Sequence, residues 1–228
     1  MILKAVIFDF DGIIADTEPL HFRAFLDVLA PEGISFTWDE YLERYIGFDD
    51  RDMFRTVFTD HNKNLTPRQM SELIGRKTER FMDAVEQGVE ACPGVVELVE
   101  HLAGRLPLGL CSGALLCDIE PIMNRLGLFD LFTVLVSAEQ VRASKPDPES
   151  YRLAVRRLQD AFPEKSIESG QCLAIEDTPA GIESARGAGV AVLAVSNSFP
   201  SRLLAGADQV VSTLAGMQAN NLEAVLSR

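Results

Sequence analysis

Cysteine and histidine are scarce in this sequence of 228 residues, which contains four cysteines and three histidines. The cysteines form neither a Cys-x-x-Cys pair nor a zinc-ligand spacing with histidine; they are Cys92, Cys111, Cys117 and Cys172. A disulfide-stapled secreted domain and a structural zinc site are therefore both disfavoured. We expect free thiols and a reducing compartment.

Positive charge is scarce as well. Lys and Arg total 21 against 34 Asp and Glu, which gives a formal net charge of −13. Nucleic acids and anionic membrane surfaces attract basic proteins, so neither is an expected partner. The apolar run after Lys4 is short and ends in acidic residues, so it predicts neither a signal peptide nor a membrane span. The sequence thus indicates a cytoplasmic protein.

The remaining composition is that of an ordinary globular protein, with 47% hydrophobic and 24% charged residues. A chain of this length can bury roughly 70% of its unfolded surface, which is enough for a core without disulfides. No internal repeat and no Pro-rich or Ser-rich linker divides the chain. Domain boundaries must therefore be recognised from changes in pattern.

Five short apolar runs predict buried strands. They cover residues 4–9, 106–111, 132–137, 171–176 and 190–195. Each run lies next to a stretch with helical periodicity, such as Ile119, Ile122 and Met123. Strands that alternate with helices form parallel sheets with right-handed crossovers. The predicted fold class is α/β, with a doubly wound, Rossmann-like parallel sheet as its core.

The alternation stops between the first and second strands, where only helical periodicity remains. The helical stretches lie near residues 22–29, 53–58 and 70–81, the last with Thr66 as its N-cap and Pro67 as its first residue. One crossover needs a single helix, so this segment predicts a small all-helical cap domain inserted after the first strand. The alternative is that these helices cover one face of the sheet. The predicted domains are residues 1–15 with 92–228, and residues 16–91.

Polar residues follow four of the predicted strands. In chain order they are Asp9-Phe10-Asp11-Gly12, Ser112-Gly113, Ser144-Lys145-Pro146 and Glu176-Asp177-Thr178. Open parallel sheets bind ligands outside the carboxyl ends of their strands. Carboxylates, a hydroxyl and a lysine at one edge predict a site for a metal ion and a phosphate. Singly, the four have ordinary explanations: an Asp-rich turn, a strand-end cap, a solvated lysine and a helix start.

The order and spacing of Asp9-Phe10-Asp11-Gly12, Ser112, Lys145-Pro146 and Glu176-Asp177 resemble the four motifs of the haloacid dehalogenase superfamily. The resemblance covers nearly the whole chain. The position of the helical insert is similar to that in the subgroup with an α-helical cap, which includes β-phosphoglucomutase and many sugar-phosphate phosphatases.

The resemblance implies a mechanism. Asp9 would attack phosphorus and form an aspartyl-phosphate, and Asp11 would be the general acid and then the general base. Mg²⁺ would mask the charge between nucleophile and phosphate, held by the carboxylates of Asp9, Asp177 and Glu176 and by the main-chain carbonyl of Asp11.

The same resemblance assigns the phosphate contacts. Ser112 and the Gly113 amide would hold phosphoryl oxygens, and Lys145 would neutralise the phosphate and tie the nucleophile in place. Thr178 is also a good N-cap and Pro179 a good first helical residue, so a helix is expected to begin beside the metal ligands.

Three residues of the insert match the mutase pattern. Thr17 and His21 match it around the hinge, although a histidine near a helix start is equally well explained as a surface residue. Lys77 lies on the edge of the apolar stripe of its helix, which predicts a side chain that snorkels to solvent. By resemblance, Lys77 would instead contact the substrate.

The chain departs from the mutase pattern in two places. An arginine that grips a second phosphate would stand three residues after Gly47, but Asp50 is at that position and Arg51 follows it. Arg51 is therefore the nearest candidate for this contact. After the second strand, Ala114 and Leu115 replace a Ser-Lys pair. Fewer cations would meet a bisphosphorylated intermediate, which favours release of the phosphate.

We therefore expect a Mg²⁺-dependent phosphatase that acts on a small phosphorylated metabolite, a sugar phosphate, as a monomer or weak homo-oligomer. The first alternative is a phosphosugar mutase of the β-phosphoglucomutase type. An alternative of another class is a non-catalytic phospho-acceptor module, which is usually far smaller and has no helical insert.

Overall fold

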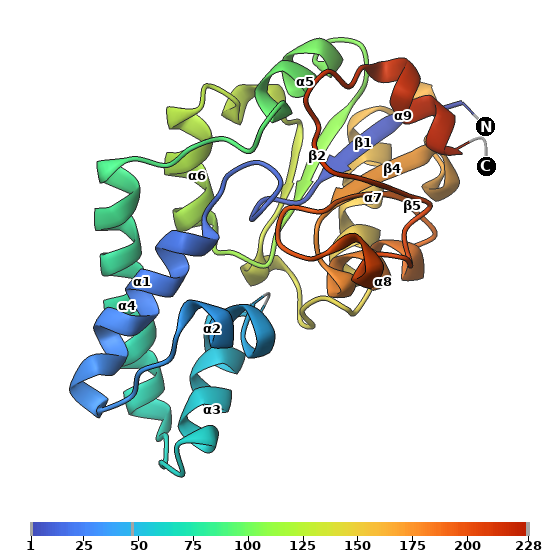
Figure 1. Cartoon of the computed structure of the whole chain (residues 1–228). Coiled ribbons are helices and arrows are strands. Elements are labelled where there is room, and N and C mark those ends of the chain that lie inside the picture. Colours follow the sequence, from blue (N-terminus) through green and yellow to red (C-terminus); the bar gives the residue numbers. More distant parts are fainter. Residues whose placement is uncertain (1, 47, 227–228) are drawn as a thin grey trace. The chain divides into compact units, whose positions relative to one another are not determined.

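The computed structural model describes residues 2–46 and 48–226. Within these residues six parallel strands form one sheet in the order β3-β2-β1-β4-β5-β6 (Figure 1). The strands are β1 (Ala5–Phe8), β2 (Leu108–Cys111), β3 (Val134–Val136), β4 (Cys172–Glu176), β5 (Ala191–Val195) and β6 (Gln209–Val211). The sheet is extended outward in both directions from β1, so the predicted doubly wound α/β class is confirmed.

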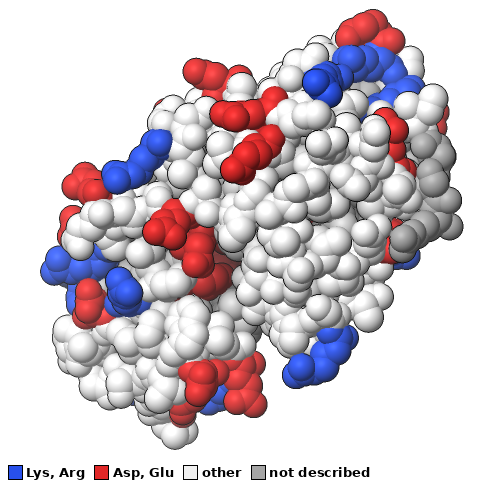
Figure 2. Space-filling view, turned by 45° about the horizontal axis from the view of Figure 1, so that its top comes forward, with Lys and Arg blue, Asp and Glu red and all other residues white. Residues whose placement is uncertain are grey.

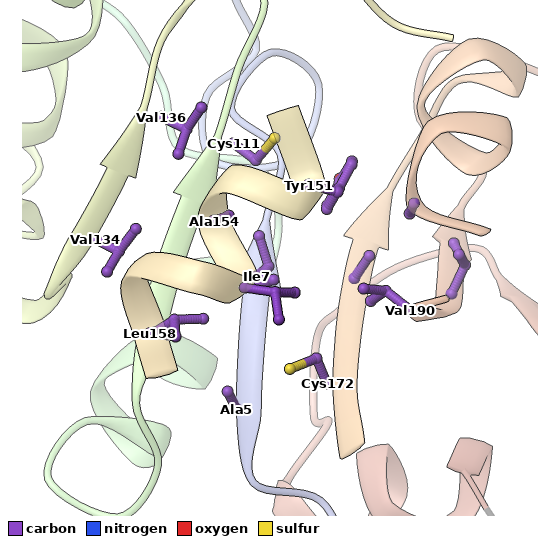
Figure 3. Packing of buried hydrophobic residues seen from close by; sticks show 14 of the residues in the cluster. Ala5, Ile7, Cys111, Val134, Val136, Tyr151, Ala154, Leu158, Cys172 and Val190 are labelled. Carbon is purple, nitrogen blue, oxygen red and sulfur yellow. The ribbon is translucent and has the colours of Figure 1, made fainter. Parts of the chain in front are cut away.

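β1 shows why these segments form strands. Ala5 and Ile7 belong to the apolar cluster that packs under α7 (Glu149–Ala161), as Figure 3 shows. Val6 and Phe8 are equally buried, and successive side chains of a strand point to opposite faces. The strand is therefore covered on both faces, which requires a continuous apolar run instead of an alternating one.

Among its described residues, the α/β unit contains four further helices, of which the first three lie between strands and the last follows β6. They are α5 (Val95–Leu102), α6 (Leu116–Arg125), α8 (Pro179–Gly187) and α9 (Ala219–Leu226). Short 3-10 helices lie in its loops at Phe129–Leu131, Ala138–Gln140, Pro163–Lys165, Ser169–Gln171 and Ser201–Leu203. The sequence analysis missed β6, because its three residues are only half-buried at the sheet edge and too few to show a period.

The regular elements among the described residues of the insert are all helices. It contains α1 (Glu18–Leu29), the 3-10 turn Ala30–Glu32, α2 (Trp38–Arg44), α3 (Asp50–Asp60) and α4 (Pro67–Gln87). The start of α4 is as predicted, with the Thr66 hydroxyl accepting a hydrogen bond from the Gln69 amide. The sequence analysis missed α2, whose seven residues bury mainly Tyr41 and so show little periodicity.

The chain forms two compact units. One comprises Met1–Asp16 and Ala91–Arg228, and the other comprises Thr17–Glu90. All four cysteines are free thiols. Among the described residues, no helix has both the length and the apolar character needed to cross a membrane. On the face shown in Figure 2, acidic side chains occur in several separate places, as expected of a solubilising surface.

Candidate active site

The strand order brings three of the predicted polar segments to one edge of the sheet. β1 pairs with β2 on one side and β4 on the other, with Phe8 opposite both Leu110 and Ile175. Asp9 directly follows β1 and donates its amide to the Ile175 carbonyl (2.9 Å). Because parallel strands end at the same edge, the residues after β1, β2 and β4 must lie together there.

Three carboxylates meet at this edge. Ligand oxygens of Asp9, Glu176 and Asp177 all lie within 4.8 Å of one another, and the three residues are at most 6% exposed. Asp11 is half-buried and its side chain is not part of this group. Of the four acids expected to meet, the structure therefore places three in a buried cluster, with Asp11 two residues from Asp9.

Lys145 supplies the cation of this site. Its Nζ donates to Asp9 Oδ1 (2.8 Å), Glu176 Oε1 (2.6 Å) and the Cys111 carbonyl (3.0 Å). Burial alone would lower the pKa of Lys145, but the carboxylates of Asp9 and Glu176 outweigh burial and hold the pKa well above its usual value. The side chain is therefore a largely buried ammonium, only 13% exposed, and its interpretation as a solvated loop charge is wrong.

The pKa of Asp9 reflects the concentration of buried negative charge in the cluster. Burial, followed by the negative charge of Glu176, raises this pKa from its usual 3.8 to about 7, although Lys145 opposes the shift. One ammonium thus does not balance three buried carboxylates. A hard divalent cation that takes oxygen ligands suits such a donor set, so the residues present fit Mg²⁺.

Glu176 has protein partners for both of its oxygens. Oε1 accepts from Lys145 and from the buried Tyr151 hydroxyl (2.7 Å), and Oε2 accepts from the Thr178 hydroxyl (3.3 Å). Lys145 also lies 5.2 Å from the centre of the Tyr151 ring. The sequence analysis did not single out Tyr151, because this residue lies among the buried, mainly apolar positions of α7.

The start of α8 lies beside the acidic cluster. As predicted, Thr178 is the N-cap, and its hydroxyl accepts from the Gly181 amide (3.0 Å). A Cβ atom on Gly181 would overlap the Glu176 carboxylate. Only glycine therefore allows the first turn of α8 to approach Glu176 so closely.

The Gly181→Ala substitution tests this close approach. In most helices alanine is more stable than glycine, but here the added methyl group must displace Glu176, so we expect the free energy of unfolding to fall by roughly 1–3 kcal/mol. Gly75→Ala in α4 is the control, because its Cβ would meet nothing within 4 Å. Urea unfolding followed by circular dichroism measures both. If Gly181→Ala raised stability as Gly75→Ala should, the crowding would be absent.

The predicted phosphate contacts line one small hollow. Ser112, Gly113, Ser144 and Lys145 are among its lining residues. The Ser112 hydroxyl accepts from the Ala114 amide (2.9 Å), so this serine is the strand-end cap that was one of its two interpretations. The hydroxyl can still donate its own hydrogen, so the cap does not exclude a phosphate contact.

The helical unit buries the lysine that was expected to snorkel. Lys77 is only 2% exposed, its Nζ is 2.8 Å from Asp50 Oδ1, and it donates to His21 Nδ1 (2.8 Å). The rings of Phe25 and Phe81 flank the ammonium, each with its centre 5.0 Å away. The snorkelling interpretation is wrong, because these partners solvate the charge inside the protein.

The other expected substrate residues of the insert lie in different environments. Thr17 is fully buried at the start of α1, whereas Arg51 is exposed in the first turn of α3. His21 is half-buried and stacks on Phe81 with ring centres 4.3 Å apart, so it is not a fully solvated surface side chain. Gly47, the residue from which the position of the expected arginine was counted, lies outside the described residues.

Residues 6–195 match the family model described as haloacid dehalogenase-like hydrolase. The chain belongs to this family. The resemblance inferred from the four motifs is thereby confirmed, as is the enzyme class of phosphomonoester hydrolase within the haloacid dehalogenase superfamily.

Named relatives of this haloacid dehalogenase-like hydrolase cover most of its length. Protein CbbY from Cereibacter sphaeroides is 30% identical over 222 residues, or 93% of each chain. A phosphorylated carbohydrates phosphatase from Thermotoga maritima is 32% identical over 194 residues, or 82% of each chain. β-Phosphoglucomutase from Bacillus subtilis is 29% identical over 214 residues, or 92% of this chain and 89% of its own.

A solved structure extends the comparison to the fold. The crystal structure of CbbY from Rhodobacter sphaeroides in complex with phosphate superposes with a TM-score of 0.84 at 27% identity, covering 97% of this chain and 99% of that one. The Rossmann-like core with an inserted helical cap is thus a shared architecture. The relatives include both phosphatases and a mutase, so the choice between these activities depends on the chain's own residues.

Proposed function

We propose that this hydrolase is a Mg²⁺-dependent phosphatase that removes phosphate from a small phosphorylated metabolite, a sugar phosphate, through an aspartyl-phosphate. The observation that carries the proposal is Asp9, a buried carboxylate tied by Lys145 at the carboxyl edge of the sheet, next to Glu176 and Asp177. A site of this charge is suited to hold a divalent cation and, through it, a phosphate.

In the first step Asp9 attacks phosphorus. The P–O bond to the sugar breaks as the bond to the Asp9 carboxylate forms, which divides a slow hydrolysis into two easier steps. Lys145 holds Asp9 Oδ1 and so orients the attacking carboxylate. We propose that Ser112 and the Gly113 amide donate to phosphoryl oxygens, since both line the hollow beside Lys145.

Asp11 moves the protons. It donates a proton to the leaving sugar oxygen and then takes one from the water that hydrolyses the aspartyl-phosphate. Its carboxyl is half-buried and does not belong to the cluster of three. Asp9 and Asp11 are therefore suited to different roles, nucleophile and acid–base.

The metal would be held mainly by Asp9 and Asp177, with the Asp11 carbonyl as a further ligand. Mg²⁺, when bound, would neutralise the charge of the nucleophile and of the phosphate. Glu176 lies within ligand distance of the other two carboxylates, but its oxygens accept from Lys145, Tyr151 and Thr178. We propose that Glu176 mainly orients Lys145, and through Lys145 the ligand Asp9, instead of binding the metal itself.

The Lys77–Asp50 ion pair supports phosphatase over mutase activity. The helical unit would need spare positive charge to hold a second phosphate, and Asp50 neutralises Lys77 there. We propose that Thr17, His21, Arg51 and Lys77 belong to the substrate-selecting part of the chain, with a mutase as the alternative function. We also propose that the protein is cytoplasmic and is a monomer or weak homo-oligomer.

Chelation of the metal is expected to lower phosphatase activity by at least about 100-fold, because several kcal/mol of charge stabilisation are lost. Binding of inorganic phosphate should disappear as well, since the remaining site is acidic. Stopped assays before and after addition of excess Mg²⁺ to the chelated enzyme provide the measurement and its reversal. Full activity in a metal-free preparation verified by elemental analysis would refute the metal requirement.

A panel of phosphorylated metabolites with Mg²⁺ tests the activity itself. We expect sustained release of free phosphate with at least one sugar phosphate. For hexose 1-phosphates the assay also measures isomerised product in the presence of a bisphosphate activator. Isomerisation faster than phosphate release would make the chain a mutase, and one equivalent of stable phosphoprotein without turnover would make it a phospho-acceptor.

A further inference from the structure

A fifth segment reaches the site, from the loop that follows β5. The Ser198 hydroxyl donates to Asp177 Oδ2, and the Asn197 side-chain amide donates to the Gly12 carbonyl (2.6 Å). β5 pairs with β4 in parallel, with Ala194 opposite Glu176. The loop after β5 therefore emerges at the same edge of the sheet as Asp177.

From these contacts we infer that Asn197 and Ser198 are positioning residues that set the affinity of the site for Mg²⁺. The inference rests on the proposed function, which makes Asp177 and the Asp11 carbonyl metal ligands. Neither residue belongs to the four motifs. Both act through another residue, Ser198 through the Asp177 carboxylate and Asn197 through the turn at Gly12.

Ser198 restrains the rotation of the Asp177 carboxylate. With Oδ2 committed to the Ser198 hydroxyl, the plane of the Asp177 carboxylate is set before a cation arrives. Groups that hydrogen-bond to metal ligands in this way raise metal affinity by about 10–100-fold. Without the hydroxyl this restraint is lost, and ordering the Asp177 carboxylate around the ion costs more entropy.

Asn197 holds the other side of the same site. Gly12 has a φ of +72°, and a Cβ atom there would overlap Asp177 and Ser198. The turn after β1 and the loop after β5 are thus in direct contact across Asp177. The Asn197 hydrogen bond fixes the Gly12 carbonyl, which belongs to the residue after Asp11. It thereby helps to set the distance between the Asp11 carbonyl and the Asp177 carboxylate, the two proposed ligands.

Isothermal titration calorimetry of the substrate-free protein with Mg²⁺ tests the inference directly. Ser198→Ala should weaken Mg²⁺ binding by roughly 10–100-fold, and Ser198→Thr, which keeps the hydroxyl, should restore most of the affinity. Asn197→Ala, an independent variant, should weaken binding in the same direction. The matched control is Ser196→Ala in the same loop. The Ser196 hydroxyl donates to the Val211 carbonyl (3.4 Å), which is not part of the proposed metal site.

Activity gives a second measurement that separates positioning from folding. In Ser198→Ala the Mg²⁺ concentration for half-maximal activity should rise by a similar factor, while kcat at saturating Mg²⁺ changes much less. A variant with reduced thermal stability but wild-type Mg²⁺ affinity would show a purely structural role and overturn the inference.

The result for the wild-type protein separates the two proposals. If the wild type and both variants bind Mg²⁺ equally well, the inference fails and the proposed function stands. If the wild type itself binds no Mg²⁺, the proposed function fails and the inference fails with it. If Ser196→Ala weakens binding as much as Ser198→Ala, the effect is not specific to Asp177, and the inference is overturned.

Discussion

Replacing Asp9 with asparagine is expected to lower turnover by about 10⁴-fold or more, because the amide cannot form the aspartyl-phosphate. The substitution keeps the size of the side chain, so the geometry of the edge is preserved. Release of phosphate from the best substrate of the panel measures the effect. The control is Asp160→Asn at the exposed end of α7, which makes the same chemical change away from the site. Wild-type turnover by Asp9→Asn would disprove the nucleophile assignment.

Asp9→Asn should still fold, but the pH dependence of its folding stability should differ from that of the wild type. The unfolded chain releases the Asp9 proton near pH 3.8, whereas the folded metal-free protein keeps it until about pH 7. A raised acid pKa means that folding stability is lost as the pH rises between these values. Asparagine has no such proton, so this loss should be absent in Asp9→Asn. Urea unfolding of the metal-free proteins at pH 5 and pH 8 gives the comparison.

Replacing Lys145 with methionine is expected to reduce both stability and activity. The raised pKa of Lys145 means that its ammonium stabilises the fold at every pH below the usual lysine value, which includes neutral pH. Removing it leaves the buried carboxylates of Asp9 and Glu176 without their cation. We expect the free energy of unfolding to fall by about 3–5 kcal/mol and turnover to fall by roughly 10²–10³-fold.

Lys165→Met is the matched control, because it makes the same change at an exposed position. Urea unfolding without metal compares the two variants. Adding Glu176→Gln to Lys145→Met removes one of the two carboxylates that have lost their cation. The double variant should therefore recover part of the lost stability. Equal stability of Lys145→Met and Lys165→Met would show that the three hydrogen bonds of Lys145 contribute nothing to folding.

The sequence was sufficient for the residues that directly follow strands. Asp9, Ser112 and Asp177 were placed together without coordinates, because a buried parallel strand has a recognisable apolar run and the carboxyl ends of parallel strands lie at the same edge of the sheet. The same logic would have found Ser198. It lies in a Ser-Asn-Ser stretch directly after the predicted strand at residues 190–195.

Contacts between different elements could not be predicted in this way. Tyr151 occupies a position on the apolar face of α7, and only the packing of that helix on the sheet carries its hydroxyl to Glu176. Lys77 and Asp50 belong to different helices of the insert, and periodicity describes one helix at a time. Contacts between elements depend on packing, which a pattern along the chain does not contain.

The sequence by itself determined the fold class, the helical insert and the four motif segments, because burial imposes a local pattern on each strand and helix. Only the tertiary structure decided which charges face each other. It gave Lys145 a second carboxylate partner, Glu176, beside the Asp9 contact that the motifs had implied, paired Lys77 with Asp50, and brought Ser198 to Asp177. The physical reason is that a buried charge is stable only beside its partner in space, and that partner can be more than a hundred residues away in the chain.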